Sequence, residues 1–187
     1  LRDATSGKLL AEGLTEGSTG DTQKIMHAQG RNPDRAGEGV AAFKAVLDLT
    51  APTLVELVAQ GPMGHPGSAL TVTQQRWVMP GQSVTEGDGW VVEVPGLVIT
   101  PQTKIADGKL AVSAKVELMC GCPITPGGLW DAADYETTAS LWQGGKQFAA
   151  SKLSFATTPG GYEGAVALPA KGRYRLLIFA RNIRTGN

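Results

Sequence analysis

The chain has 187 residues, of which 42% are hydrophobic and 18% charged, and its 17 basic and 17 acidic residues cancel at neutral pH. This composition is ordinary for a soluble globular protein, and the balanced charge argues against a strongly basic nucleic-acid-binding surface. No run of residues approaches the roughly 20 consecutive apolar positions of a membrane-spanning helix. The 25 glycines and 11 prolines are scattered at turn spacing, which favours many short strands over helices.

Short strands separated by turns are predicted along the whole chain. Ser6-Gly7 predicts a tight N-terminal hairpin, and the polar segment 15–40 predicts a long loop with one edge strand at Ile25-Met26-His27. Further strands are predicted at 43–49, 53–60, 70–78, 90–99, 110–118, 135–142, 148–155, 162–168 and 174–182. Because no segment longer than about two turns has helical apolar spacing, the sequence predicts an all-β protein.

One strand–turn–strand pattern occurs twice, at 43–59 and at 162–180. In each copy an aromatic residue opens an alternating strand, a turn containing proline follows, and a second strand ends on alanine. A unit that recurs about a domain's length apart indicates two related domains in tandem. We therefore expect one domain at residues 1–95 and a second at 96–187.

The run Gly172-Arg-Tyr174-Arg-Leu176-Leu-Ile178-Phe-Ala180 carries a family resemblance. With the order of the predicted strands, it resembles bacterial immunoglobulin-like and fibronectin type III-like domains. The resemblance implies two tandem immunoglobulin-like antiparallel β-sandwich domains. It also implies that Tyr174 opens the sixth strand of the second domain and bonds back to the backbone. Thr53 stands at the matching place in the first domain.

Both domains are incomplete under this mapping. The first lacks two strands at its beginning, and the second ends after its sixth strand. Either terminal segments are missing from the sequence, which the ordinary mobility of chain ends favours, or sheet edges are left open to pairing by another chain.

Met119-Cys120-Gly121-Cys122 contains the only two cysteines of the chain. In an extended strand such a pair holds its Cα atoms roughly 6–7 Å apart, near the limit for bridging, and Gly121 supplies a bend that permits a strained Cys120–Cys122 disulfide. Two thiolates beside the thioether of Met119 are instead soft ligands suited to Cu(I). Two inert thiols that act as small buried hydrophobic residues at a strand end are a third possibility. The disulfide is the favoured state, and the metal site is the alternative.

Other residues with metal-binding or recognition chemistry are scarce. His27 adjoins Met26 and His65 follows Met63, but chance and packing explain these pairs better than a His–Met copper site does. The acids at 131, 134 and 136 beside Trp130 form a rim suited to a carbohydrate or a cation, although a hydrated loop with a capping residue is favoured. No Ser–His–acid set follows from the spacing of the two histidines.

The sequence thus predicts a non-enzymatic, exported tandem β-sandwich module without a cofactor. We expect it in the periplasm or outside the cell, binding a protein or forming part of a cell-surface assembly, with no nucleic acid as partner. The alternative is a copper-handling or thiol-redox protein that uses Met119, Cys120 and Cys122 for Cu(I). The strand at 174–182 has apolar residues on both faces, which predicts that a neighbouring domain or a partner chain covers it.

Overall fold

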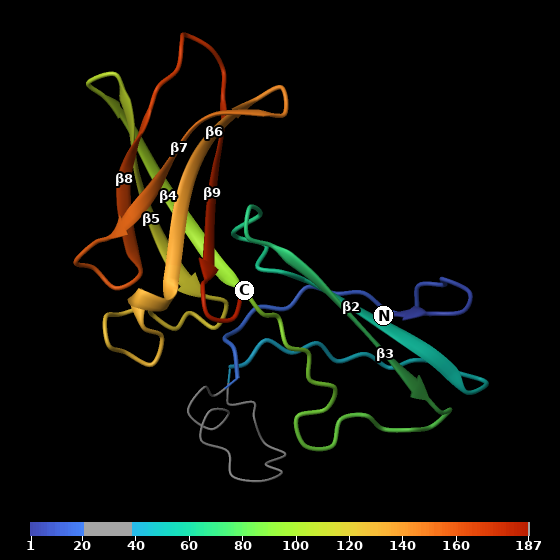
Figure 1. Ribbon diagram of the computed structural model, residues 1–187. Helices are drawn as coiled ribbons and strands as arrows, with labels where there is room; N and C mark the ends of the chain where they lie inside the picture. The colour runs from blue at the N-terminus through green and yellow to red at the C-terminus, as the bar shows by residue number, and fades with distance from the viewer. Residues whose placement is uncertain (21–38, 187) are drawn as a thin grey trace. The chain divides into compact units, whose positions relative to one another are not determined.

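The fold is described from a computed structural model, for residues 1–20 and 39–186. Within these residues every regular element is a β-strand, apart from one short 3₁₀ turn, and all strand pairs are antiparallel. The all-β prediction is therefore confirmed (Figure 1). Two compact units are present, Leu1–Gly61 with Leu70–Val94 and Pro62–Ala69 with Pro95–Asn187. The domain boundary at residue 95 stays a prediction.

The first unit contains a three-stranded sheet in the order β1 (Arg2–Asp3), β2 (Thr53–Gly61) and β3 (Leu70–Val78). β2 and β3 pair along their whole length, from Thr53 opposite Val78 to Gly61 opposite Leu70. Val55 and Val78 are the buried hydrophobic side chains of this sheet. The predicted strands at 53–60 and 70–78 are confirmed.

Two strands predicted for the first unit are wrong. Residues 43–49 alternate in hydrophobicity but form no strand; Val46 is 93% exposed and Phe43 is 47% exposed. Residues 90–94 also lack strand structure, and the predicted strand begins only at Leu97. Alternation favours an extended chain, but a strand also needs a ladder with a second strand, and neither segment forms one with the described residues. The first copy of the repeated pattern is therefore not a pair of strands. The edge strand expected at 25–27 lies outside the described residues.

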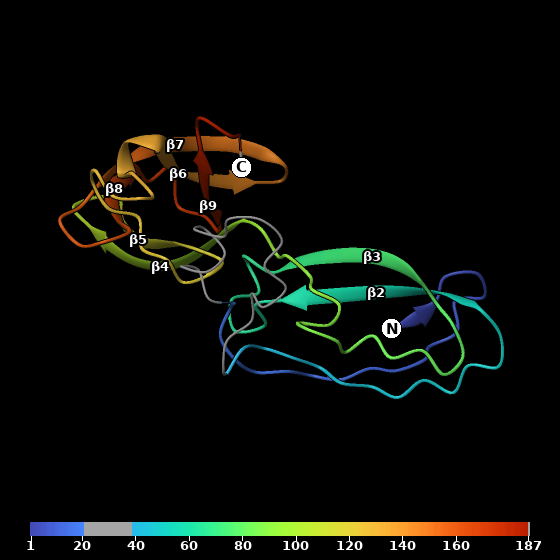
Figure 2. The same ribbon diagram turned by 90° about the horizontal axis from the view of Figure 1, so that it is seen from below.

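The second unit contains six strands and the 3₁₀ turn. These are β4 (Leu97–Ala106), β5 (Lys109–Leu118), η1 (Ala132–Asp134), β6 (Tyr135–Gln143), β7 (Lys146–Phe155), β8 (Gly161–Ala167) and β9 (Arg175–Asn182). Their spatial order is β4-β5-β8-β7-β6-β9. β7 and β8 share only two residue pairs, Ser154–Glu163 and Phe155–Tyr162, so β4-β5-β8 and β7-β6-β9 form two nearly separate sheets. Figure 2 shows β6 and β7 in one layer and β4 and β5 in the other, an arrangement consistent with a β-sandwich.

The core of the second unit lies between these two sheets. Side chains at every second position of the strands point inward, as the period-two pattern of the sequence predicts. The buried hydrophobic residues on the strands are Val112, Ala114, Val116, Tyr135, Ala139, Leu141, Leu153, Tyr162 and Val166. Ile124, in the loop after β5, is also fully buried in this core.

Tyr174 makes the contact that the sequence predicts for it. Its hydroxyl donates a hydrogen bond to the backbone oxygen of Ala170, at 3.1 Å. Its ring meets the edge of Phe148, with centroids 5.6 Å apart. These contacts tie the segment between β8 and β9 to the start of β9.

The hydroxyl of Tyr162 is buried in the core and has no hydrogen-bond partner among the described residues. Burial, together with the nearby Tyr135, raises the pKa of Tyr162 to about 12. The ring itself is well placed, packing edge-on against Phe155 at a centroid distance of 5.5 Å. The hydroxyl therefore contributes no compensating hydrogen bond within this core.

We expect Tyr162→Phe to be at least as stable as the wild type at pH 7, because it removes a buried polar group whose desolvation typically costs about 1–3 kcal/mol. The pKa of an unfolded tyrosine is about 10, so the unfolded chain loses this proton more readily than the folded one. The ionisation of Tyr162 therefore has no effect on stability below about pH 10 and lowers stability as the pH rises towards 12. Urea midpoints at pH 7 and pH 11 check this. An identical alkaline loss in both proteins would contradict it.

Candidate functional site

The cysteines lie in a tight turn at the end of β5. The backbone N–H of Gly121 donates to the oxygen of Leu118 at 2.7 Å, and the N–H of Leu118 donates to the oxygen of Cys122 at 3.2 Å. Gly121 has a φ of 75°, a left-handed conformation that glycine adopts without the steric penalty of a side chain. The turn therefore explains why a glycine separates the two cysteines.

Cys120 and Cys122 are both half-buried thiols whose sulfurs are not bonded to one another. Burial raises the pKa of Cys120, and a side-chain hydrogen bond with Cys122 raises it further. A thiol with a raised pKa stays protonated at neutral pH and is a weak nucleophile. The turn thus brings the two predicted residues together, while their disulfide and their metal-bound state stay predictions.

Met119, the predicted third sulfur ligand, precedes this turn and is half-buried. Its backbone N–H donates to the oxygen of Gly96 at 3.0 Å, which anchors the turn to the start of β4. Across residues 1–20 and 39–186, no group of three or more histidine, cysteine, aspartate or glutamate side chains is placed to hold a metal ion. Any Cu(I) site here would therefore depend on the two thiols and the thioether.

Among the described residues, His65 does not join the two cysteines in a metal-binding group. His65 lies in the segment between β2 and β3, where its backbone N–H donates to Pro62 and its carbonyl accepts from Ser68. Met63 beside it is 61% exposed. His27 and Met26 lie outside the described residues.

The acids near Trp130 are engaged in local structure. The Oδ1 atom of Asp131 accepts from the backbone N–H groups of Ala133 and Gly127, at 3.0 and 3.1 Å, and these bonds lower the pKa of Asp131. Asp134 pairs with Arg184 at 3.0 Å. Trp130 packs against the core. Asp131 is thus the cap of the 3₁₀ turn, which is the structural role that the sequence favoured for it.

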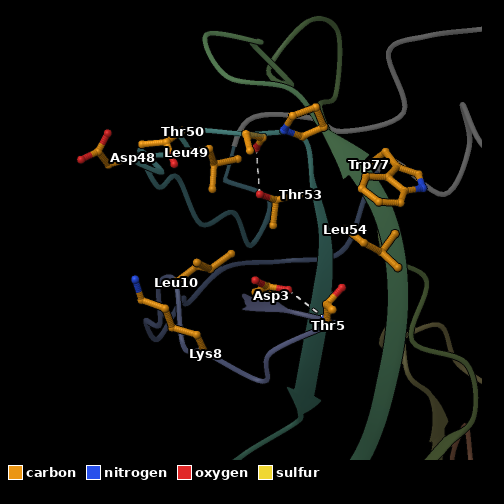
Figure 3. A pocket seen from close by; sticks show the side chains of 12 residues that line it. Asp3, Thr5, Lys8, Leu10, Asp48, Leu49, Thr50, Thr53, Leu54 and Trp77 are labelled. Carbon is orange, nitrogen blue, oxygen red and sulfur yellow. Dashed lines mark hydrogen bonds between the residues drawn. The ribbon is translucent and has the colours of Figure 1, made fainter.

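A pocket of about 420 Å³ lies in the first unit (Figure 3). Its lining combines residues of the N-terminal hairpin with the segment 48–54 and Trp77. The pKa of Asp3, on its wall, is lowered by the hydroxyl of Ser6 and by the backbone N–H groups of Thr5 and Ser6. This carboxylate is thus held by its own turn. Sequence reasoning missed the pocket because its three parts are far apart in the chain.

The outer face of β9 exposes large apolar side chains, as the two-faced pattern of this strand suggested. Leu177 is 48% exposed and Phe179 is 55% exposed. They lie opposite Ser140 and Thr138 of β6, on the side of the sheet away from the core. The next residue along β6 on this face is Trp142, whose indole N–H donates to the Oγ atom of Ser140 at 2.8 Å. This outer face, defined by Leu177, Phe179 and Trp142, is the apolar patch discussed below.

Comparison of the chain with protein-family models, curated proteins and solved structures finds no match. The described residues contain no helix long and apolar enough to cross a membrane.

Proposed function

We propose that the protein is a non-enzymatic, exported binding or structural module whose partner is another protein, in the periplasm or on the cell surface. We also propose that residues 95–187 form an immunoglobulin-like or fibronectin type III-like sandwich. The strand order and the hydrogen bond from Tyr174 to Ala170 support this assignment, because a tyrosine corner before the sixth strand is a hallmark of such domains. The described residues of the first unit form one sheet, so the assignment is not extended to it.

The apolar patch on β9 carries the functional proposal. Leu177 and Phe179 are exposed, although the residues between and beside them, Leu176 and Ile178, already pack against the core. The second set of apolar side chains on this strand therefore does not serve the core. Grouped apolar side chains rimmed by charges are typical of surfaces that bind other proteins. A binding role accounts for this patch without requiring any catalytic group.

The experiment is site-specific photocrosslinking in cells that produce the protein. A benzoylphenylalanine side chain placed at Phe179 should yield a covalent adduct with one partner protein, identified by mass spectrometry. The control position is Glu163, which is exposed on β8 in the other sheet. Adducts at Phe179 alone support the proposal. Equal labelling at both positions, or none at Phe179, would contradict it.

The turn that contains Cys120 and Cys122 favours a second candidate function, which is thiol redox chemistry or copper handling. The specific observation is the tight turn that places Cys120 and Cys122 together, closed by the hydrogen bonds from Gly121 to Leu118 and from Leu118 to Cys122. Two thiols on one tight turn are suited to forming a disulfide or to binding one soft metal ion.

Native, non-reducing mass spectrometry of protein purified without added metal separates these states. A mass two hydrogens below that of the dithiol shows the Cys120–Cys122 disulfide and supports an oxidising, exported location. A copper adduct that is lost in Cys120→Ser supports metal handling and contradicts the binding module as the main function.

A further inference from the structure

β4 and β9 are the two end strands of the second unit, and each has a single strand neighbour among the described residues. β4 pairs with β5 alone, and β9 pairs with β6 alone. The two strands lie near each other, and in Figure 1 they diverge towards the end of β4 and the beginning of β9. β9 therefore presents a row of backbone donors and acceptors that no second strand pairs with, whereas on β4 the N–H of Ile99 already donates to the Oγ atom of Ser68 at 3.0 Å.

The inner face of β4 is poorly covered along the second half of the strand. Pro101, Thr103 and Ile105 lie opposite the inward-pointing residues of β5. Their partners Ala114 and Val112 are buried, whereas Pro101 and Thr103 are exposed and Ile105 is 69% exposed. The core is therefore closed over β5 and over the start of β4, where Leu97 and Ile99 pack against it, but open over the end of β4.

The inner side chains of β9 are also incompletely covered. Leu176, Ile178 and Ala180 lie opposite the buried residues Leu141, Ala139 and Thr137 of β6 and point into the core. They are nevertheless only partly buried, unlike those β6 partners. One more extended segment, hydrogen-bonded to β9, would cover the inner side chains of both end strands.

We infer that the open side between β4 and β9 accepts an extended strand from a partner protein, which pairs with β9 by strand addition. This inference rests on the proposed binding function and names its surface and mode. Backbone hydrogen bonds to β9 would supply affinity, and alternate apolar side chains of the partner would fill the space over Ile105, Leu176 and Ile178.

The charged side chains of β9 indicate what kind of partner strand would pair with it. On its outer face Arg175 and Arg181 flank Leu177 and Phe179, and no acid lies on this strand. Arg181 faces Glu136 across the ladder at 4.0 Å, while Arg175 lies opposite Trp142. A complementary strand carries an acid opposite each arginine, because opposite charges directly across a ladder are stabilising.

A second copy of this chain does not place an acidic residue opposite each arginine of β9. Antiparallel pairing of two β9 strands about Ile178 would place Arg175 of each copy opposite Arg181 of the other. Like charges directly opposite each other destabilise a sheet. The charge pattern thus selects a partner with acidic residues, rather than a homodimer joined through β9.

The test uses a fluorescent peptide with the core sequence Glu-Val-Thr-Val-Thr-Val-Glu, flanked by glycine and serine. The pattern is symmetric, so it matches Arg175 and Arg181 in either strand direction. Anisotropy titration of the full chain should give saturable binding. Replacing the central valine by proline should lower the affinity of the peptide at least about tenfold, because proline removes a ladder donor. Replacing both glutamates by lysine should lower the affinity by a similar factor, because lysine repels the arginines. Hydrogen exchange should slow at β9 amides when the peptide binds.

Two protein variants complete the test. Ile105→Asp changes a side chain that is 69% exposed, so the fold should be retained while the apolar space is lost and peptide affinity falls at least about tenfold. Arg175→Glu should shift the preference from the glutamate peptide towards the lysine peptide.

Equal binding of all three peptides, or unchanged binding by Ile105→Asp, would overturn the inference. So would concentration-dependent dimers in sedimentation that Ile105→Asp abolishes, since these would identify a second copy as the occupant. If no peptide binds but Phe179 still crosslinks to a partner, strand addition is excluded while the proposed binding function stands.

Discussion

Gly160→Ala should destabilise the second unit by at least about 3 kcal/mol. Gly160 lies in the turn before β8 with a φ of 68°, a left-handed conformation. A Cβ atom built at this position collides with the backbone oxygen of Val116. The same residue accepts a hydrogen bond from Val116 N–H and donates one to the Ile124 oxygen, both at 2.8 Å. An alanine therefore strains the backbone and disrupts two buried links at once.

Gly145→Ala is the matched control. Gly145 has a φ of 78° in the β6–β7 turn, but a Cβ atom there meets no atom within 4 Å. Only the left-handed conformation is penalised in this variant, by about 1–2 kcal/mol. Urea unfolding of both variants, followed by tryptophan fluorescence, measures the difference. Equal losses of stability would show that the contact with Val116 is unimportant.

Ile124→Ala should cost about 2–5 kcal/mol, the usual range for truncating a fully buried isoleucine. Ile124 is 0% exposed and packs in the core of the second unit, although it lies in the loop between β5 and η1. Its side chain is one of the largest that are fully buried in this protein. Truncation leaves a cavity that the surrounding β-sheets can fill only partly.

The control for this second variant comes from the same loop. Leu129 is 68% exposed, so Leu129→Ala should change the free energy of unfolding by less than about 0.5 kcal/mol. Unfolding midpoints of the two variants decide between a loop that is part of the core and one that merely connects strands. A loss in Ile124→Ala no larger than in Leu129→Ala would contradict the packing described here.

The two variants concern one structural unit, because Ile124 and Gly160 are joined through their backbones. The loop after β5 and the turn before β8 meet at this bond, and the cysteine turn lies immediately before Ile124.

The local pattern of the chain determined most of the strands in both units. β3 was predicted with the bounds it has, and the strand predicted at 110–118 differs from β5 by one residue. Alternation works for these segments because one face of each strand is buried and the other is exposed. The bond from Tyr174 to the backbone was also predicted from the sequence, since a corner tyrosine needs only neighbouring residues to make it.

Tertiary structure alone decided the features that depend on distant neighbours. Residues 43–49 have the alternation of a strand but form no ladder with another described strand, whereas Ile124 lacks any strand pattern and is fully buried. Strand pairing and burial are properties of what lies beside a segment, and a period-two pattern contains no information about that neighbour. By contrast, the apolar character of both faces of β9 was visible in the sequence, because it depends only on the residues of that strand. The open side between β4 and β9 emerged only when the register placed Ile105 and Ile178 on incompletely covered inner faces.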